Sequence, residues 1–444
     1  MSASPTPISR RSALRRLSAA AAAFSAPAAF RRHAAAAPSE TVLHASFGGS
    51  GMAMSDVQSL ASNKHFKLVA VADVDLARTR QIQKLFPDVK IYQDWRKLLD
   101  KEKDLNSVNV STPDHMHAPI TMSAMRRGLH VYTQKPLTQT IHEARRLTEA
   151  ARDNKLVTQM GIQIHSHVVH RTVVETIQAG AIGKVREVHS WSGKDWGDRN
   201  PRPDRKDPVP PEMNWDGWLG VASTRPFIAG YYHPGEWRKR LDFGTGTFGD
   251  MGCHILDPVY ASLALTAPKS VRSDGDSPNA DSWGLDNRVR YIFPATPHTA
   301  DELTLHWYNG AHRPPEEIKA LLGKHAMTSQ GSIYIGSEGV LYSPYIDTPV
   351  LLPEDKFKDF KLPEPGGRNH YHQFIDACRG EGETSAPFAY SGPLTEMVLL
   401  GCLSTRFPKQ TLEWDGPGLK VTNVPEANAF VRKRYRHGWE VEGI

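Results

Sequence analysis

Residues 41–51 read TVLHASFGGSG, and this stretch decides how the N-terminal part of the chain is built. Its first six residues suit a strand, the glycine-rich end suits a tight turn, and the pattern up to residue 62 is helical. A second apolar run at 67–73 ends on Asp73, 22 residues after Gly51. The order of strand, glycine turn, helix and strand predicts a βαβ unit of a parallel sheet.

Strand and helix patterns continue to alternate beyond this unit. Strands are predicted at 107–110 and 129–132, and a helix at 142–154 followed by a strand at 156–160 would complete a doubly wound parallel sheet. We therefore expect an N-terminal Rossmann domain in residues 38–162.

The pattern of apolar and polar residues changes after residue 180. Four predicted strands, 185–191, 287–293, 302–308 and 332–335, alternate apolar and polar residues, as in an antiparallel sheet with one covered face. Two late helices, 370–378 and 394–407, are expected to pack on that sheet. The second predicted domain, residues 163–444, is thus an α/β domain with a large, open and mainly antiparallel sheet, whose open face could join copies into a homo-oligomer.

The first 37 residues hold six arginines and no acid, so the net charge of +6 belongs to them, and residues 38–444 sum to zero. The pair Arg10-Arg11, the apolar run 17–30 and the small residues 34–37 resemble a twin-arginine export signal. This predicts a periplasmic or other extracytoplasmic protein, and a disordered basic tail is the alternative. Without a basic stripe or a long apolar run after residue 37, neither a nucleic-acid partner nor a transmembrane segment is expected.

The glycine turn carries the first chemical signal. A dinucleotide needs its pyrophosphate close to backbone N–H groups at a helix N-terminus, which glycine permits, although Ser46 replaces the first glycine of the usual pattern. Asp73 can accept hydrogen bonds from ribose hydroxyls and would repel a 2′-phosphate, which favours NAD over NADP despite the nearby Arg78. A tight turn without a ligand is the alternative. The predicted cofactor contacts here are Gly48, Gly49, Ser50, Gly51, Met52 and Asp73.

Three later motifs follow in order: STPDHMH at 111–117, QKP at 134–136 and GDMGCH at 249–254. With the glycine turn, they resemble the Gfo/Idh/MocA family, the relatives of glucose-fructose oxidoreductase and inositol dehydrogenase, over residues 41–410. The resemblance implies a Rossmann domain joined to an open-sheet domain, with the nicotinamide of NAD at the junction. It also implies further cofactor contacts from Thr112, Pro113, His117, Gln134 and Gln163.

The same resemblance maps the lysine of the family's Glu-Lys-Pro motif onto Lys135, and its Asp-x-x-x-His pair onto Asp250 and His254. Oxidising a secondary alcohol requires a base for the hydroxyl proton and a cation near the developing alkoxide, roles that these residue types can fill. The four-residue spacing places Asp250 and His254 on one helix face, with His254 as the acid/base and Asp250 orienting its ring or holding a substrate hydroxyl. The alternatives are a helix-capping aspartate and a core histidine.

Lys135 follows a buried-looking strand and precedes a proline, so it is expected to share the proton transfer. Because Gln134 stands where the family has a glutamate, an anion is missing beside it, and Lys135 is expected to lose its proton more easily. A solvated lysine at a strand end is the alternative.

Sugars bind to aromatic platforms with nearby polar groups, and five of the ten tryptophans fall between residues 191 and 237. The predicted substrate contacts are His165, Trp196, Trp237 and Arg238. The histidines around 165–170 have no carboxylate at ligand spacing, so no metal site is expected.

Together these features predict an NAD-dependent oxidoreductase that acts on a secondary hydroxyl of a sugar, polyol or glycoside. Its cofactor would be tightly bound, because free NAD is scarce outside the cytoplasm. Two alternatives stay open. One is a redox-neutral NAD-dependent glycosidase, implied by resemblance to the N-acetylgalactosaminidase branch, and the other is a non-catalytic protein that binds sugar or NAD.

Overall fold

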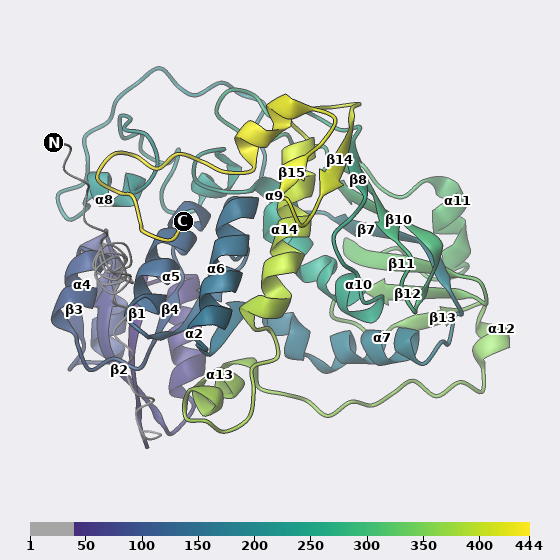
Figure 1. Cartoon of the computed structure of the whole chain (residues 1–444), viewed down its shortest axis with the longest axis horizontal. Helices are drawn as coiled ribbons and strands as arrows, with labels where there is room; N and C mark the ends of the chain where they lie inside the picture. Colours follow the sequence, from purple (N-terminus) through teal and green to yellow (C-terminus); the bar gives the residue numbers. More distant parts are fainter. Residues whose placement is uncertain (1–39) are drawn as a thin grey trace, which may run out of the picture. The chain divides into compact units, whose positions relative to one another are not determined.

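The computed structural model describes residues 40–444, so the predicted export signal at 1–37 lies outside the described residues. Their N-terminal part folds around a six-stranded parallel sheet in the order β3-β2-β1-β4-β5-β6 (Figure 1). This strand order confirms the predicted Rossmann fold. Its strands and helices are β1 (Val42–Phe47), α2 (Met52–Ala61), β2 (Phe66–Ala72), α3 (Arg80–Leu85), β3 (Lys90–Tyr92), α4 (Trp95–Lys101), β4 (Ser107–Val110), α5 (His117–Met125), β5 (His130–Gln134), α6 (Ile141–Asp153) and β6 (Thr158–Gly161).

Local sequence sets the ends of these elements. Helix α6 begins at a capping box, in which the Thr140 hydroxyl accepts from the backbone N–H of Glu143 and the Glu143 carboxylate accepts from that of Thr140. The buried strands β1 and β4 carry Phe47, Val108 and Val110 into the core beneath them. The sheet is thus covered on both faces, as parallel sheets require.

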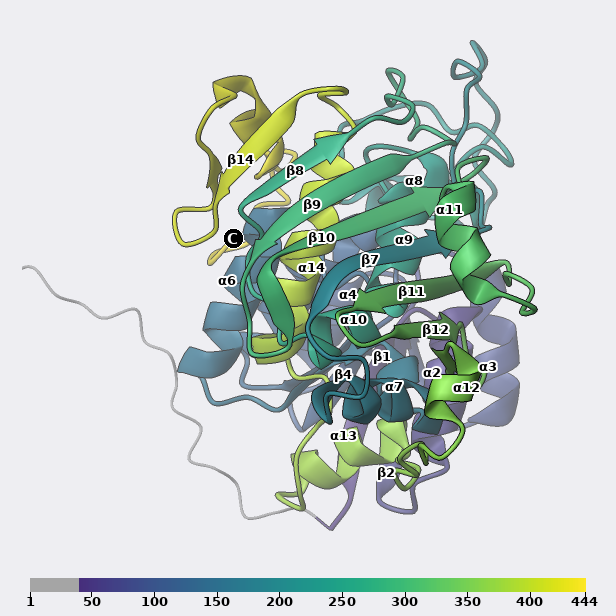
Figure 2. The same cartoon turned by 90° about the vertical axis from the view of Figure 1, so that its right-hand side faces the viewer.

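The second sheet has nine strands in the order β13-β12-β11-β7-β10-β9-β8-β14-β15 (Figure 2). Neighbouring strands run antiparallel except for the central pair β7 and β10, which run parallel, so the sheet is mixed and mainly antiparallel. The strands are β7 (Val185–Ser192), β8 (Ser270–Ser273), β9 (Arg288–Pro294), β10 (Thr299–Asn309), β11 (Gln330–Gly336), β12 (Val340–Pro344), β13 (Val350–Leu352), β14 (Thr411–Asp415) and β15 (Lys420–Val421).

Helices cover one face of this sheet, and Figure 2 shows α9, α10 and α14 behind it. On the opposite face, Leu322 and Ile318 after and within α11 pack against Trp191 and Tyr308 at one end, so the open face is partly covered. The helices of this half are α7 (Val168–Gln178), α8 (Trp215–Leu219), α9 (Gly246–Ile255), α10 (Asp257–Ser262), α11 (Glu316–Lys319), α12 (Glu354–Phe357), α13 (His370–Cys378) and α14 (Phe388–Ser404).

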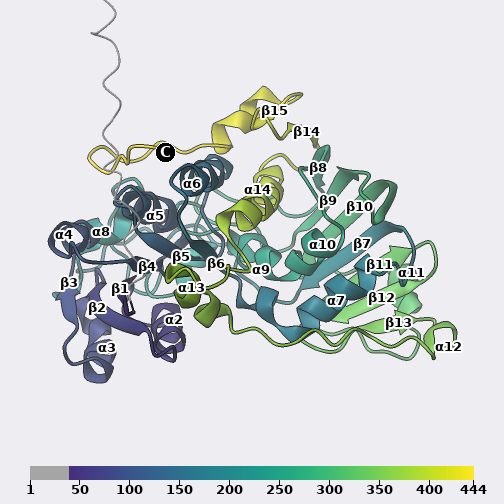
Figure 3. The same ribbon diagram turned by 60° about the horizontal axis from the view of Figure 1, so that its bottom comes forward.

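One packing prediction is wrong. Helix α13 does not pack on the second sheet but lies beside α2 of the Rossmann domain (Figure 3), where Phe374 and Ile375 join a cluster with Val42 and Tyr132. Apolar side chains on one face of α13 fit this surface, and the Asn63 amide donates to Asp376 at 2.9 Å. Late residues of the chain therefore belong to the surroundings of the N-terminal sheet.

None of the helices in residues 40–444 combines the length and apolar character needed to cross a membrane.

Candidate active site

A cleft opens at the carboxyl ends of β1, β2, β4 and β5, the edge where parallel α/β sheets bind ligands. Its floor is the glycine turn after β1, and its opposite wall comes from the second half of the chain through Trp218, Trp237 and Arg238. Of the predicted site residues, those that line it are Gly48, Ser50, Gly51, Met52, Asp73, Thr112, Pro113, His117, Gln134, Lys135, Trp237 and Arg238.

The glycine turn has the backbone that a pyrophosphate requires. Gly48 (φ 109°) and Gly51 (φ 58°) adopt conformations that side chains disfavour, and a Cβ on Gly48 would lie 2.8 Å from the Ser111 carbonyl oxygen. Near Gly51, by contrast, a Cβ would meet only the tip of Arg78 at 4.0 Å. Ser46, which replaces the usual glycine, donates from Oγ to the Gly48 carbonyl at 2.8 Å and so braces the turn.

Asp73 closes one end of the cleft. Its Oδ2 accepts from the backbone N–H of Gly49 at 2.9 Å, which ties the end of β2 to the turn. Burial raises the pKa of Asp73, although the backbone N–H groups of Asp75 and Gly49 oppose the shift. Arg78 donates from Nε to Ser50 Oγ at 2.8 Å. Asp73 and Arg78 therefore both line the cleft.

The loop after β4 brings a group that sequence analysis missed. Asp114 lines the cleft and accepts from Thr245 Oγ1 at 2.8 Å. Burial raises its pKa to about 7, against the lowering effect of Arg238. It stands inside the quoted STPDHMH motif, so the signal was present. His117 contacts the carbonyls of Thr112 and Pro136, each at 2.8 Å, and thereby fastens this loop to the loop of Lys135.

Gln134 has an unexpected partner. Its Nε2 donates to both carboxylate oxygens of the buried Asp56 of α2, each at 2.9 Å. Asp56 also accepts from Ser111 Oγ at 2.7 Å and from the Tyr371 hydroxyl of α13 at 3.1 Å. A glutamate at position 134 would face this carboxylate directly, so the amide suits Asp56 as a hydrogen-bond donor.

This buried carboxylate makes stability depend on pH. Burial raises the pKa of Asp56 from 3.8 to about 6, so the folded protein holds a proton that the unfolded chain has released between these values. Its contribution to the free energy of unfolding is therefore present below about pH 4 and is lost as pH rises through about 6. Asp56→Asn should remove this trend, so that wild type loses roughly 3 kcal/mol relative to the variant across this window in denaturant titrations. Parallel curves for the two proteins would contradict the assignment.

The two halves of the chain meet in an ion pair. Lys135, directly after β5, pairs with the carboxylate of Asp250 on α9, and its ammonium also donates to the Asp250 carbonyl at 3.1 Å. Arg238 Nε donates to the same carboxylate at 3.2 Å. Burial alone would raise the pKa of Asp250, but Lys135 and Arg238 hold it well below its ordinary value.

This pair changes two predictions about the site. The anion that is missing at position 134 is supplied by Asp250, which pairs with Lys135 from the second half of the chain. Asp250 makes no hydrogen bond to His254 within residues 40–444 and holds Lys135 instead.

His254 lies one turn after Asp250 on α9, as the spacing predicts. It is buried, and its Nδ1 has no hydrogen-bond partner among residues 40–444. Burial, with a smaller effect from Lys135, lowers the pKa of His254 to about 3. The imidazole is therefore neutral at neutral pH.

Of the predicted substrate contacts, Arg238 binds Asp250 and also lies against two tryptophan rings. Its guanidinium lies 4.3 Å from the ring centre of Trp237 and 5.6 Å from that of Trp196, which is not among the residues lining the cleft. Trp218, another of the five tryptophans in this stretch, does line it. The stack of Trp215 and Trp218, with ring centres 4.8 Å apart, supports this wall from behind.

Gln163 and His165 lie in the 3₁₀ turn after β6, outside the set of cleft-lining residues. His165 pairs with Asp257, and with His170 these residues form one of two groups in residues 40–444 whose side chains could reach a common metal ion. The other is Glu187, His189 and His306 on the second sheet. Asp257 was missed because it is distant in sequence from the histidines.

The Gfo/Idh/MocA family model, an oxidoreductase family with an NAD-binding Rossmann fold, matches residues 45–162. The family's C-terminal alpha/beta domain matches residues 169–299. The chain belongs to this family of oxidoreductases, and its N-terminal domain is an NAD-binding Rossmann domain.

Two curated relatives share part of the chain. Levoglucosan dehydrogenase from Pseudarthrobacter phenanthrenivorans is 25% identical over 191 residues, which are 43% of this chain and 40% of that protein. Inositol 2-dehydrogenase 4 from Saccharopolyspora erythraea is 31% identical over 124 residues, 28% of this chain and 36% of that protein. These alignments thus span well under half the length of either relative.

The fold resembles solved structures over most of its length. An inositol dehydrogenase homolog from Azotobacter vinelandii, complexed with NADH and myo-inositol, matches with a TM-score of 0.56 and 19% identity over 85% of this chain and 98% of that chain. At this identity the likeness shows the shared two-domain fold.

Proposed function

We propose that this protein oxidises a secondary hydroxyl of a sugar, polyol or glycoside, with NAD as the hydride acceptor. The observation that supports the proposal is the Lys135–Asp250 ion pair, because it joins a lysine of the Rossmann domain to α9, where His254 follows Asp250 by one helical turn. A cation and a neutral base next to a dinucleotide cleft are what this reaction needs.

The residues of the cleft fit NAD. The turn at Gly48 and Gly51 leaves the backbone accessible to a pyrophosphate, and Asp73 offers a carboxylate at the distance along the chain that suits ribose hydroxyls. Thr112, Pro113 and Gln134 line the side of the cleft nearer Lys135. When bound, NAD supplies the hydride acceptor, and the protein supplies position, charge and proton transfer.

His254 and Lys135 divide the proton chemistry. The neutral imidazole of His254 takes the hydroxyl proton, and the Lys135 ammonium stabilises the negative charge that develops on the substrate oxygen. Asp250 keeps that ammonium in place, and Arg238 shares the carboxylate while standing over Trp237. The tryptophan ring offers an apolar surface to the C–H face of a sugar.

One experiment separates this proposal from its alternatives. The purified protein is denatured and released nicotinamide is measured by absorbance; the native protein is then given free sugars with a redox acceptor, or nitrophenyl glycosides. Reduction of the acceptor supports an oxidoreductase, whereas nitrophenol release without added NAD supports a redox-neutral glycosidase. Sugar binding with neither reaction would leave a non-catalytic binding protein.

Asp73 should set the choice of cofactor. Asp73→Ala removes the carboxylate that repels a 2′-phosphate, so NAD binding should weaken about tenfold while the preference for NAD over NADP falls by more than that. Fluorescence titration with both reduced cofactors measures the two dissociation constants. Asp100→Ala, which removes an exposed acid of α4 that pairs with Arg127, serves as the control. Equal loss of both cofactors would show that Asp73 only supports the turn.

Export through residues 1–37 and self-association through the open face of the second sheet remain proposals of the same account, supported by the arginine pair and by the partly uncovered sheet.

A further inference from the structure

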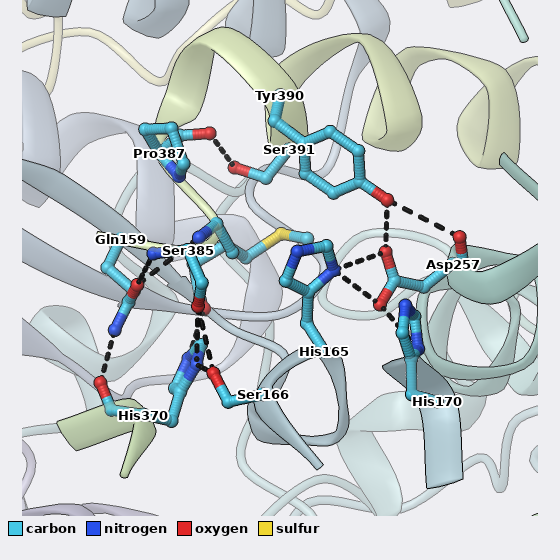
Figure 4. Close-up of polar contacts among 12 residues, drawn as sticks. Gln159, His165, Ser166, His170, Asp257, His370, Ser385, Pro387, Tyr390 and Ser391 are labelled. Atoms are coloured by element: carbon cyan, nitrogen blue, oxygen red, sulfur yellow. Dashed lines mark hydrogen bonds and ion pairs between the residues drawn. The ribbon is translucent and has the colours of Figure 1, made fainter. Parts of the chain in front are cut away.

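One carboxylate and two imidazoles meet at the start of α10 (Figure 4). Asp257 is the first residue of α10, His170 lies in the first turn of α7, and His165 lies in the 3₁₀ turn before α7. The Nδ1 atoms of His165 and His170 are 3.0 and 3.3 Å from the same oxygen, Oδ2 of Asp257. The fold thus supplies the carboxylate that the sequence around residues 165–170 lacks.

Hydrogen bonds do not account for His170. Its side chain is only 3% exposed, and neither Nδ1 nor Nε2 has a hydrogen-bond partner among residues 40–444. Nδ1 therefore approaches the Asp257 carboxylate at 3.3 Å without the geometry of a hydrogen bond. Buried polar side chains are normally hydrogen-bonded, and an exception calls for another partner, such as an ion.

The three donor atoms suit a divalent transition-metal ion such as Zn²⁺. Imidazole nitrogens and carboxylate oxygens bind zinc at about 2.0–2.2 Å, usually in a tetrahedral arrangement. Such bonds place neighbouring ligand atoms about 3.4 Å apart. The separations of 3.0 and 3.3 Å found here are close to this value, and all three donor atoms lie within 4.8 Å of one another. Two imidazoles also favour zinc over magnesium or calcium, which prefer oxygen ligands.

Asp257 is itself held in place, as metal-binding carboxylates usually are. The Tyr390 hydroxyl of α14 donates to Oδ1 of Asp257, while Oδ2 faces both histidines. The side chain of Asp257 is fully buried and that of His165 is 15% exposed, so the group is accessible from the side of His165. With three protein ligands, a fourth position is left there for a water molecule.

The second group of possible ligands, Glu187, His189 and His306, differs in its hydrogen bonds. Both ring nitrogens of His189 have partners, since Nε2 lies 3.0 Å from Glu187 and Nδ1 lies 3.0 Å from the Tyr308 hydroxyl. His306 Nε2 is 3.2 Å from the same oxygen of Glu187. These contacts account for that cluster without an ion, so it provides a control within the same chain.

We propose that His165, His170 and Asp257 bind one Zn²⁺ ion, which joins the turn after β6 and the start of α7 to α10. None of the three is among the residues that line the cleft, so the role of the ion is to hold these elements together. Ser166 Oγ, next to His165, lies 2.9 Å from His370 Nδ1, so the same turn also anchors α13. The proposal does not depend on the oxidation proposed above.

Zinc binding is tested on the purified full-length protein without an affinity tag, stripped of metal and titrated with Zn²⁺ against a chromophoric chelator. We expect one ion per chain with submicromolar affinity. His170→Asn and Asp257→Asn should each weaken binding by at least about 100-fold, and Tyr390→Phe by about 10-fold. His306→Gln, in the other cluster, should bind as wild type does. Zn²⁺ should also raise the Tm of wild type and leave that of His170→Asn unchanged.

Crystallography with Zn²⁺ places the ion without relying on any variant. Anomalous diffraction from wild-type crystals should show one strong site between the two histidines and Asp257. If Asp257→Asn does not fold, this map and His170→Asn decide the question. The proposal is overturned if wild type binds no ion at submicromolar concentration, if His170→Asn keeps wild-type affinity, or if the ion is lost with His306→Gln.

Discussion

Replacing Lys135 with methionine is expected to lower kcat by about 10³-fold and to leave NAD affinity within a few-fold of wild type. The ammonium is the cation from the Rossmann domain that pairs with Asp250 at the junction of the two halves. Methionine keeps most of the apolar stem but cannot stabilise a negative charge on the substrate oxygen. Single-turnover absorbance at the NADH band, with affinity measured separately, distinguishes the loss of chemistry from the loss of binding.

The variant needs a control because it leaves Asp250 with one partner fewer. Removing one member of a buried pair costs about 3–5 kcal/mol, and Arg238 at 3.2 Å offsets only part of that. The double variant Lys135→Met/Asp250→Asn removes the unpaired anion and should recover stability without recovering turnover. Lys239→Met, which breaks a surface pair with Glu236, should change neither. Turnover near the wild-type value in the single variant would defeat the role of Lys135.

His254→Ala is expected to lower kcat by about 10²- to 10⁴-fold, because the neutral imidazole is the proposed proton acceptor. Its Nδ1 has no hydrogen-bond partner among residues 40–444, so this nitrogen is free to bind a substrate hydroxyl. The cavity left by alanine should admit free imidazole, which should restore part of the activity in proportion to its neutral form. A stopped-flow series at several pH values measures this rescue.

Two further variants test whether His254 acts as the base. His254→Asn keeps a polar side chain of similar size and should stay as inactive as the alanine variant, whereas His437→Ala on the surface should behave as wild type. If His254→Asn retained full activity, the histidine would be a packing residue and the base would lie elsewhere.

Much of the fold could be predicted because the spacing of apolar residues within short segments indicates where strands and helices form. The strand and helix alternation around TVLHASFGGSG is a short-range signal, and the structure has β1, α2 and β2 where it indicates. The parallel pairing of β7 with β10 was not predictable, because both strands show the same alternation whichever way they run. Helix α14 begins at Phe388, before the predicted start, since Pro393 within it masks the first turns.

The candidate site divides in the same way. Lys135, Asp250 and His254 carry motif spacing and were predicted, while Asp56 and Asp257 were missed because their partners are distant in sequence. Asp56, Gln134 and Tyr371 belong to three separate elements, α2, β5 and α13. Because they come together only in the folded chain, no single segment of the sequence indicates this contact. Asp114 is the exception, since it stood within a motif whose neighbours were assigned.

We propose that the glycine turn, Lys135 and His254 converge on one nicotinamide ring between the two halves of the chain. A crystal structure of the protein with bound NAD tests it most directly. We expect the pyrophosphate over Gly51 and the nicotinamide between Lys135 and the α9 face that carries His254. A nicotinamide that points away from α9, or a cofactor bound outside this cleft, would contradict it.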